Sequence, residues 1–254
     1  MSAFSLALVL GAACLHAAWN LLAKRAGDGG VAFVWLCAAL ATLLYAPVAA
    51  IAFLVIDPHI GSREAIFLVG SGTLHACYFT LLQRGYRVGD LSVVYPLARG
   101  TGPMLSTALA IAFLGERPSA VALAGAAGIC AGVVVLGRTT SSGSSGDARA
   151  GVVFGLATGV LIAVYTLWDR HVVAELAVPP LILDWAANAA RATLLAPVAL
   201  GGTNARRVWR SYRREIVAVA VLSPLAYILV LTALTVSPVS YVAPAREVSI
   251  LIGT

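Results

Sequence analysis

The sequence predicts an all-α fold, a polytopic membrane helix bundle built from two inverted five-helix repeats, the second of them incomplete. Three observations predict it. Hydrophobic residues make up 60% of the chain and charged residues only 11%, whereas soluble domains carry about 25% charge. The apolar residues form runs of roughly 20, the length that crosses about 30 Å of hydrocarbon. The two halves of the chain also share a series of short motifs.

Each apolar run is expected to be one helix, because the runs are too long and too uniformly apolar for the alternating strands of a membrane barrel. No basic residue precedes the first run and no small-residue cleavage motif follows it, so we expect a retained helix rather than a signal peptide. The predicted spans are Ala3–Ala23, Val31–Ile56, Ala65–Leu82, Leu91–Leu114, Ala120–Gly137, Gly151–Trp168, Pro180–Leu200, Ile216–Val236 and Val239–Thr254.

A short polar stretch, "TTSSGSSGDARA", divides the chain. Its serine and glycine content is typical of a flexible linker. We therefore predict a first repeat over residues 3–137, a linker over 138–150 and a second repeat over 151–254.

The two halves resemble each other in order. Each has a tryptophan 12 positions before a proline, Trp35 and Pro47 in the first half and Trp185 and Pro197 in the second (47 − 35 and 197 − 185). "HAAWNLLAKR" similarly aligns with "IAVYTLWDRH", and "PLAR" with "APAR". An odd number of spans per half would insert the second copy upside down, an arrangement common in secondary transporters.

The repeat also predicts a missing part. Thr254 corresponds to residue 107 of the first half (254 − 147), which continues to Gly137. About one and a half helices of the second half are therefore expected to be absent, and a truncated chain is favoured over a natural protein with nine spans.

Three motifs carry a resemblance to a known family: "HAAWNLLAK" in the first span, "GDLSVVYPLARGTGP" before and within the fourth, and "LGERPS" before the fifth. With them the chain resembles the drug/metabolite transporter (DMT) superfamily, in particular its EamA-type ten-helix members. The resemblance implies a central cavity between the halves, no use of ATP, and cargo such as amino acids, other small metabolites or drugs. The chain departs from the family pattern in its missing tenth helix and second "GE" element.

The first span has a polar face. His16, Asn20 and Lys24 follow one another at intervals of four, with Trp19 beside them. Because an ionisable group at membrane depth costs about 2.5 to 3.5 kcal/mol, such a face should meet protein or water. We interpret it as a cavity wall; alternatively, Lys24 extends to the interface and His16 is a packed core histidine.

The third span has a second polar face, formed by Ser71, His75 and Tyr78. His75 and Tyr78 are candidate substrate-binding residues. Hydrogen bonding between helices would explain the same face.

The motifs "VYPLARGTGP" and "YVAPARE" place proline and arginine inside apolar runs. Proline kinks a helix, glycine loosens it, and freed backbone groups are tolerated at this depth where they line a cavity. An arginine offers a fork of donors suited to a carboxylate or phosphate. The substrate-binding candidates here are Tyr95, Arg99, Tyr241 and Arg246; the alternative is a structural ion pair of Arg99 or Arg246 with Glu247.

The seventh span places Asp184, Asn188 and Arg191 on one face. Opposite charges on one face can offset each other's burial cost. The functional interpretation makes Asp184, together with Glu247, a proton-coupling carboxylate. No metal site and no cofactor are predicted.

These features favour a secondary transporter that moves a small polar or anionic metabolite, an amino acid, organic acid or drug-like compound, by alternating access. A non-transporting scaffold is the alternative, and an intramembrane enzyme is disfavoured because HExxH, GxSxG and CxxC motifs are absent from the sequence. Expected partners are a small-molecule substrate and membrane lipid, but no nucleic acid, because the formal charge of +6 lies mostly at helix ends. We expect a multi-pass protein of a bacterial inner membrane; Gly125, Gly128 and Gly132 permit either a homodimer or packing within the chain.

Overall fold

The computed structural model describes residues 1–26, 29–89, 91–139, 148–201 and 204–249. All of the regular secondary structure in these ranges is helical, which confirms the predicted all-α class. Six of the described helices are long and apolar enough to cross a membrane. The helices are α1 (Ala3–Arg25), α2 (Gly30–Ile56), α3 (Ser62–Val88), α4 (Leu91–Leu114), α5 (Ala120–Thr139), α6 (Ala148–Ala174), α7 (Pro180–Leu200), α8 (Asn204–Val236) and α9 (Val239–Arg246).

Eight predicted spans correspond to α1 to α8, several of which extend further into polar sequence. The ninth corresponds to α9 only as far as Arg246; the end of that span (250–254) and most of the predicted linker (140–147) lie outside the described residues. The largest difference is α8, which begins at Asn204 rather than Ile216 and so includes the arginine-rich segment "RRVWRSYRR". A kink at Tyr212 (φ −128°, ψ 25°) separates this segment from the apolar part. Ala205 and Val208 are buried while the arginines are exposed. An apolar window excludes such an amphipathic turn because it averages over all faces of the helix.

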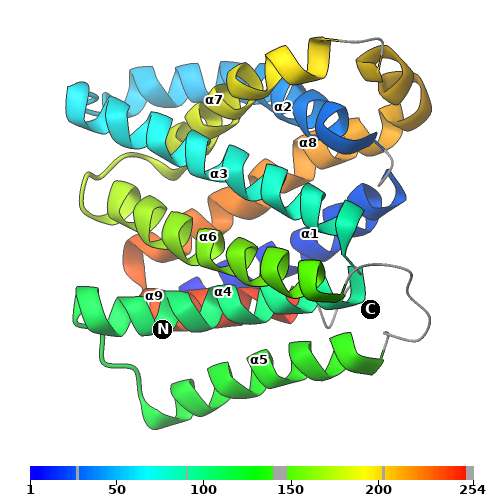
Figure 1. The fold of residues 1–254 in the computed structure, drawn as a ribbon. Helices are drawn as coiled ribbons and strands as arrows, with labels where there is room; N and C mark the ends of the chain where they lie inside the picture. The colour runs from blue at the N-terminus through cyan, green and yellow to red at the C-terminus, as the bar shows by residue number, and fades with distance from the viewer. Residues whose placement is uncertain (27–28, 90, 140–147, 202–203, 250–254) are drawn as a thin grey trace.

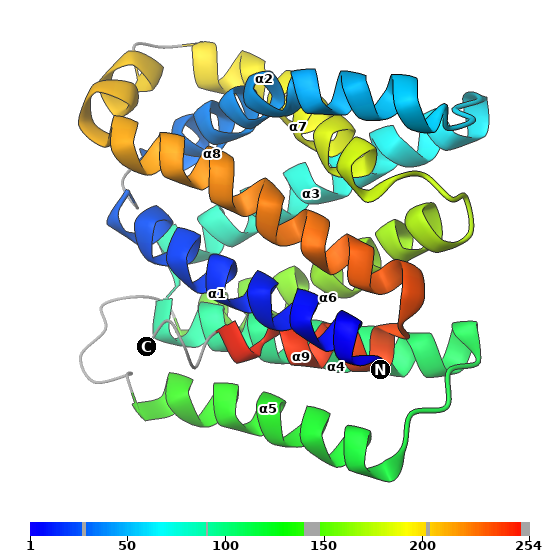
Figure 2. The ribbon, with the colours of Figure 1, turned by 180° about the vertical axis from the view of Figure 1, so that it is seen from behind.

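Helices from the two halves of the chain alternate through the bundle. In Figure 1 the levels from top to bottom are α2 with α7, α3 with α8, α1 with α6, and α4 with α9, while α5 lies outermost. Figure 2 shows the same order from behind. The contacts pair across the halves: α1 packs on α8 as α3 packs on α6, and α2 packs on α7 as α4 packs on α9. This packing is compatible with the predicted repeat, and the repeat and the inverted relation of its halves stay predictions.

Two tryptophans form reciprocal hydrogen bonds between α2 and α7. The indole of Trp35 donates to the carbonyl of Ala192, and that of Trp185 donates to the carbonyl of Thr42, both at 3.0 Å. The two donors are 150 positions apart in the sequence (185 − 35), and so are the two acceptors (192 − 42). The matched tryptophans of the two halves thus perform the same task on opposite helices.

Helix α4 continues without interruption through Pro96 and Pro103. The sequence suggested that glycine loosens this helix, but Gly102 instead permits close packing. A Cβ on Gly102 would lie 2.6 Å from Cγ2 of Ile162 on α6, closer than carbon atoms approach. Small residues let helices approach closely in lipid, where van der Waals packing drives association.

The start of α9 is held by the loop between α4 and α5. The carboxylate of Glu116 accepts hydrogen bonds from the backbone N–H groups of Val239 (2.8 Å) and Ser240 (2.9 Å). These first N–H groups of a helix have no partner within the helix. The "LGERPS" motif therefore joins the two halves of the chain.

The surface of the bundle is apolar. Leu54, Val55, Phe113 and Val121 are each at least 78% exposed, as expected of side chains that face acyl chains. Gly125, Gly128 and Gly132 of α5 have open space where a Cβ would lie, so this face does not pack against another described helix. The polar side chains that are buried instead gather inside, and they define the site described next.

Candidate functional site

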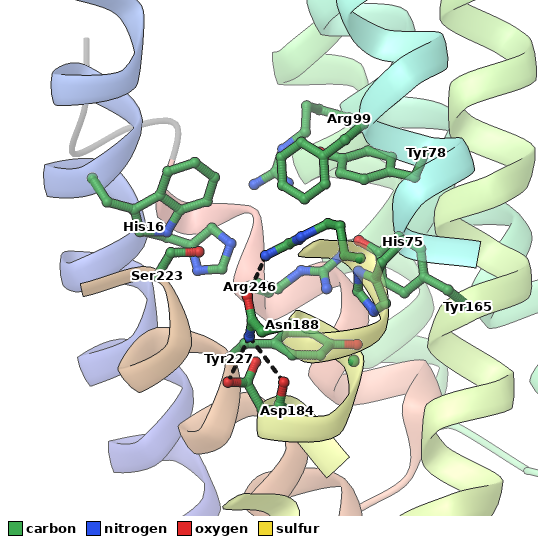
Figure 3. Close-up of a pocket in the computed structure, with 14 residues that line it drawn as sticks. His16, His75, Tyr78, Arg99, Tyr165, Asp184, Asn188, Ser223, Tyr227 and Arg246 are labelled. Carbon is green, nitrogen blue, oxygen red and sulfur yellow. Dashed lines mark hydrogen bonds between the residues drawn. The ribbon is translucent and has the colours of Figure 1, made fainter. Parts of the chain in front are cut away.

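A narrow cavity lies inside the bundle among α1, α3, α4, α6, α7, α8 and α9. The centre of a water molecule can reach about 50 Å³ of it, enough for a few waters. In Figure 3, Arg99 and Tyr78 lie at one end of the cavity and Asp184 and Tyr227 at the other. Its lining consists of His16, Trp19, His75, Tyr78, Phe79, Arg99, Tyr165, Asp184, Ala187, Asn188, Arg191, Ser223, Tyr227 and Arg246.

One carboxylate lies between two arginines at the positive part of the cavity. The Nε atom of Arg99 is 2.9 Å from Oε2 of Glu247, and Nε of Arg246 donates to Oε1 of Glu247 at 3.4 Å. Arg99 also donates to the hydroxyl of Ser249 at 3.4 Å. All three charged side chains are nearly inaccessible to solvent. Two guanidinium groups thus share one carboxylate, and this group of three side chains carries a net positive charge.

Arg246 retains hydrogen-bonding capacity in this arrangement. Its Nη2 is buried and has no hydrogen-bond partner among the described residues. An unpaired buried donor on a charged group costs free energy. A bound carboxylate, phosphate or water at this position would remove that cost.

A second polar cluster joins α3, α6 and α8: His75 and Tyr227 line the cavity, and Asp169 contacts both without being part of the lining. His75 Nε2 is 2.9 Å from Oδ2 of Asp169, and the hydroxyl of Tyr227 donates to the same oxygen at 2.5 Å. Asp169 is fully buried, and its Oδ1 has no hydrogen-bond partner in the described part of the chain. The ring of His75 also stacks on that of Tyr165, with 4.4 Å between centroids.

The polar face of α7 forms a chain of contacts. The amide of Asn188 donates to the Asp184 carboxylate at 3.0 Å and to the Asp184 carbonyl at 2.9 Å. Arg191 in turn donates to the side-chain oxygen of Asn188, and its guanidinium lies 4.6 Å from the ring centre of Phe79 on α3. The predicted one-face arrangement of these residues places all three in the cavity wall.

Aromatic and imidazole rings complete the lining. His16 and Trp19 lie on α1 with their ring centroids 5.2 Å apart. The ring nitrogens Nδ1 of His16 and Nε1 of Trp19 are buried without a hydrogen-bond partner among the described residues. Tyr78 and Tyr165 pack edge to face at 5.5 Å. This wall can take an apolar part of a ligand and still offer it hydrogen bonds.

The structure brings most of the sequence candidates together. Seven line the cavity: His16, Trp19, His75, Tyr78, Arg99, Asp184 and Arg246. Glu247 forms ion pairs with both arginines. The sequence had suggested either Arg99 or Arg246 as its partner.

Four candidates lie elsewhere. Asn20 donates to the carbonyl of His16 at 2.8 Å, within its own helix, and Lys24 is exposed near the end of α1. Tyr95 is half-buried outside the lining. The hydroxyl of Tyr241 accepts a hydrogen bond from the backbone N–H of Ser119 at 3.1 Å, in the loop before α5.

The site residues expected from the sequence did not include Asp169, Tyr165, Phe79, Ser223 or Tyr227. Asp169 is followed by a basic residue in "WDRH", a pattern that resembles a helix end at the membrane surface. A signal did exist for Tyr165, since the repeat alignment matches it with Trp19 and both line the cavity.

Comparison with known proteins places this geometry in a family. The family model described as "EamA-like transporter family" matches residues 3–138, more than half of the chain. The chain belongs to the EamA-like transporter family. It is a family of membrane transporters of the drug/metabolite type and not a family of enzymes. This EamA protein is accordingly a multi-pass membrane protein.

A solved crystal structure supports the fold of this EamA protein. The two chains are 18% identical, with a TM-score of 0.65, over 98% of this chain and 87% of the other. The likeness shows the helical arrangement alone. No curated protein matches the sequence.

Proposed function

We propose that this EamA protein is a secondary transporter that binds a small polar or anionic metabolite between its two halves and moves it by alternating access. The buried pair Arg99 and Arg246, which shares the single carboxylate of Glu247, is the observation that carries the proposal. Buried charge is costly in a membrane and is typical of a substrate or ion pathway.

The chemistry of the wall favours an anionic group on the substrate. Nη2 of Arg246 is an unpaired donor, and guanidinium groups bind carboxylates and phosphates through parallel hydrogen bonds. The rings of Trp19, Tyr78 and Tyr165 would contact the rest of the molecule. Because the cavity is narrow, binding a metabolite would require the halves to separate slightly, as alternating access does.

The test is uptake by the purified protein in liposomes without ATP. The panel is L-lactate, succinate, L-glutamate and inorganic phosphate, with L-lysine as the cationic control. We expect saturable uptake of at least one anion and none of L-lysine. Arg246→Lys keeps the positive charge but removes the parallel donors of the guanidinium group. The apparent affinity for that anion should therefore fall by about tenfold, equivalent to about 1.4 kcal/mol.

A variant on the arginine-rich segment provides the control. Arg213→Lys changes an exposed residue of α8 outside the cavity and should leave uptake unchanged. Uptake of L-lysine alone, or uptake of an anion with equal affinity in Arg246→Lys, would contradict the proposed anion site.

A further inference from the structure

The cluster formed by His75, Asp169 and Tyr227 has the geometry of a proton-binding site that opens on the cavity. Tyr227 donates its only proton to Oδ2 of Asp169, so the phenol acts as a fixed donor. His75 contacts the same oxygen through Nε2. In the neutral form of the ring, Nε2–H donates to the carboxylate and Nδ1 is left as an acceptor on a side chain that lines the cavity.

A proton on His75 would be accommodated by its surroundings. The resulting imidazolium would lie 2.9 Å from a fully buried carboxylate, and Oδ1 of Asp169 still lacks a hydrogen-bond partner among the described residues. A carboxylate at this distance accepts a hydrogen bond from Nε2–H of both the neutral and the protonated ring. Asp169 therefore acts as a positioning residue, holding the tautomer and orientation of His75.

The charges around the cavity balance when both histidines are neutral. Within the described residues, three arginines and three carboxylates line the cavity or contact its lining: Arg99, Arg191, Arg246, Asp169, Asp184 and Glu247. An anion that enters this neutral set adds an uncompensated negative charge in a region of low dielectric. Such a charge is costly unless a cation accompanies it.

We propose that His75, positioned by Asp169, takes up one proton with each monovalent anion that binds beside Arg246, so that anion and proton cross the membrane together without net charge. The inference rests on the proposed function for the anion, but the proton site rests on the geometry of this cluster.

Other titratable groups face the cluster from the neighbouring helices, and each differs from His75 in its contacts. Asp184 on α7 accepts the Asn188 amide, and Glu247 beyond α9 is held by two arginines. His16 on α1 has no carboxylate contact among the described residues. Tyr165 and Tyr78 are phenols, whose ordinary pKa of about 10 is far from physiological pH.

The test measures protonation of His75 directly, without requiring a known substrate. The full chain, labelled with 15N-histidine and placed in lipid nanodiscs, is titrated by NMR; the chain has four histidines, and His75→Gln assigns the signal. Arg246→Gln removes a positive charge from the cavity, which has the same electrostatic sign as adding an anion. We expect the titration midpoint of His75 to rise by about one pH unit.

Two further variants make the result interpretable. Should Arg246→Gln fail to fold, Ser223→Asp places a carboxylate in the same cavity wall and should raise the midpoint in the same direction. Asp169→Asn removes the positioning carboxylate and should lower the midpoint. Arg213→Gln, on the exposed part of α8, is the matched control for loss of an arginine and should shift nothing. A His75 midpoint that responds to neither cavity variant overturns the proton site.

Transport then tests the coupling separately. In liposomes that take up a monovalent anion of the panel, L-lactate or L-glutamate, a trapped pH dye should report acidification of the lumen together with anion entry, and a potassium diffusion potential should not change the rate. His75→Gln should abolish the acidification. Anion uptake that responds to the imposed potential, or that is insensitive to pH, overturns the coupling and leaves the proposed function standing. Absence of all anion uptake by the folded protein overturns the proposed function, whereas the NMR result stands by itself.

Discussion

The hydroxyl of Tyr227 and the ring of His75 contact the same oxygen of Asp169, from helices that are far apart in sequence. At this scale the site consists of shared carboxylates: Oδ2 of Asp169 contacts both Tyr227 and His75, and Glu247 forms ion pairs with two arginines. A buried carboxylate that loses one of its donors keeps its charge and loses part of its compensation. Single substitutions here should therefore have measurable effects on stability.

Tyr227→Phe tests the contribution of the donor on α8. The change keeps the ring and removes the hydrogen bond to a charged acceptor, so we expect the free energy of unfolding to fall by about 1.5 to 3 kcal/mol. Tyr45→Phe is the matched control, since the hydroxyl of Tyr45 donates at 2.7 Å to a neutral carbonyl, that of Val221, at an exposed position. Thermal unfolding in detergent measures both; equal losses would show that the charge of Asp169 adds nothing.

At the scale of elements, helices α3 and α7 pack closely where α3 has a glycine, Gly72. A Cβ on Gly72 would lie 2.4 Å from Cβ of Ala190 and 3.1 Å from the carbonyl oxygen of Ala187. Both helices carry lining residues of the cavity. The position of the site therefore depends on the absence of a side chain at Gly72.

Gly72→Val should force α3 away from α7 and lower the free energy of unfolding by about 1 to 3 kcal/mol, the usual cost of overpacking. Gly125→Val introduces the same side chain into α5, where open space surrounds the glycine, and controls for helix propensity. The melting temperatures of the two variants should differ clearly. A Gly72→Val protein as stable as Gly125→Val would mean that the two helices can separate without loss.

The clamp on α9 belongs to the same scale. Glu116→Ala leaves the N–H groups of Val239 and Ser240 without their acceptor, and we expect a loss of about 0.5 to 2 kcal/mol, as for other helix caps. The comparison is Glu175→Ala, which removes a half-exposed ion pair with Arg170 and should cost less than about 1 kcal/mol. Limited proteolysis should show earlier cleavage near Ser237 only in Glu116→Ala. Identical cleavage of the two variants would contradict the clamp.

At the scale of the whole molecule, successive helices traverse the bundle in alternating directions (Figure 1). The connections after α2 and α6 lie at one end, and the arginine-rich start of α8 lies at the other (Figures 1 and 2). Positive residues favour the cytoplasmic side of a membrane. The start of α8 is therefore expected inside.

Labelling of single cysteines in a cysteine-free background tests this arrangement. His59→Cys and Glu175→Cys should react with a membrane-impermeant maleimide in intact cells, whereas Arg210→Cys should react only after permeabilisation. The physical reason is that the helices between these positions cross the membrane, so that His59 and Glu175 lie on one side of it and Arg210 on the other. Reaction of His59→Cys and Arg210→Cys from the same side would be incompatible with the bundle.

The sequence alone determined the membrane class, the order of the helices and several buried polar positions of the site. Apolar length and the cost of burying charge are properties of each segment, so Arg99, Arg246, His16 and His75 could be selected without knowing their neighbours. Helix bounds were less predictable where a helix continues on a polar face, as at the start of α8.

The tertiary structure decided which of these side chains meet. Whether Asp169 contacts water, lipid or His75 depends on the rotation and crossing of α3, α6 and α8, which no single segment encodes. For the same reason Tyr241, although its helix also bears Arg246, bonds the loop before α5 instead of the cavity. The sequence determines which charged side chains are placed in apolar segments and therefore cost free energy to bury. Only the packing of the helices determines which partner offsets that cost.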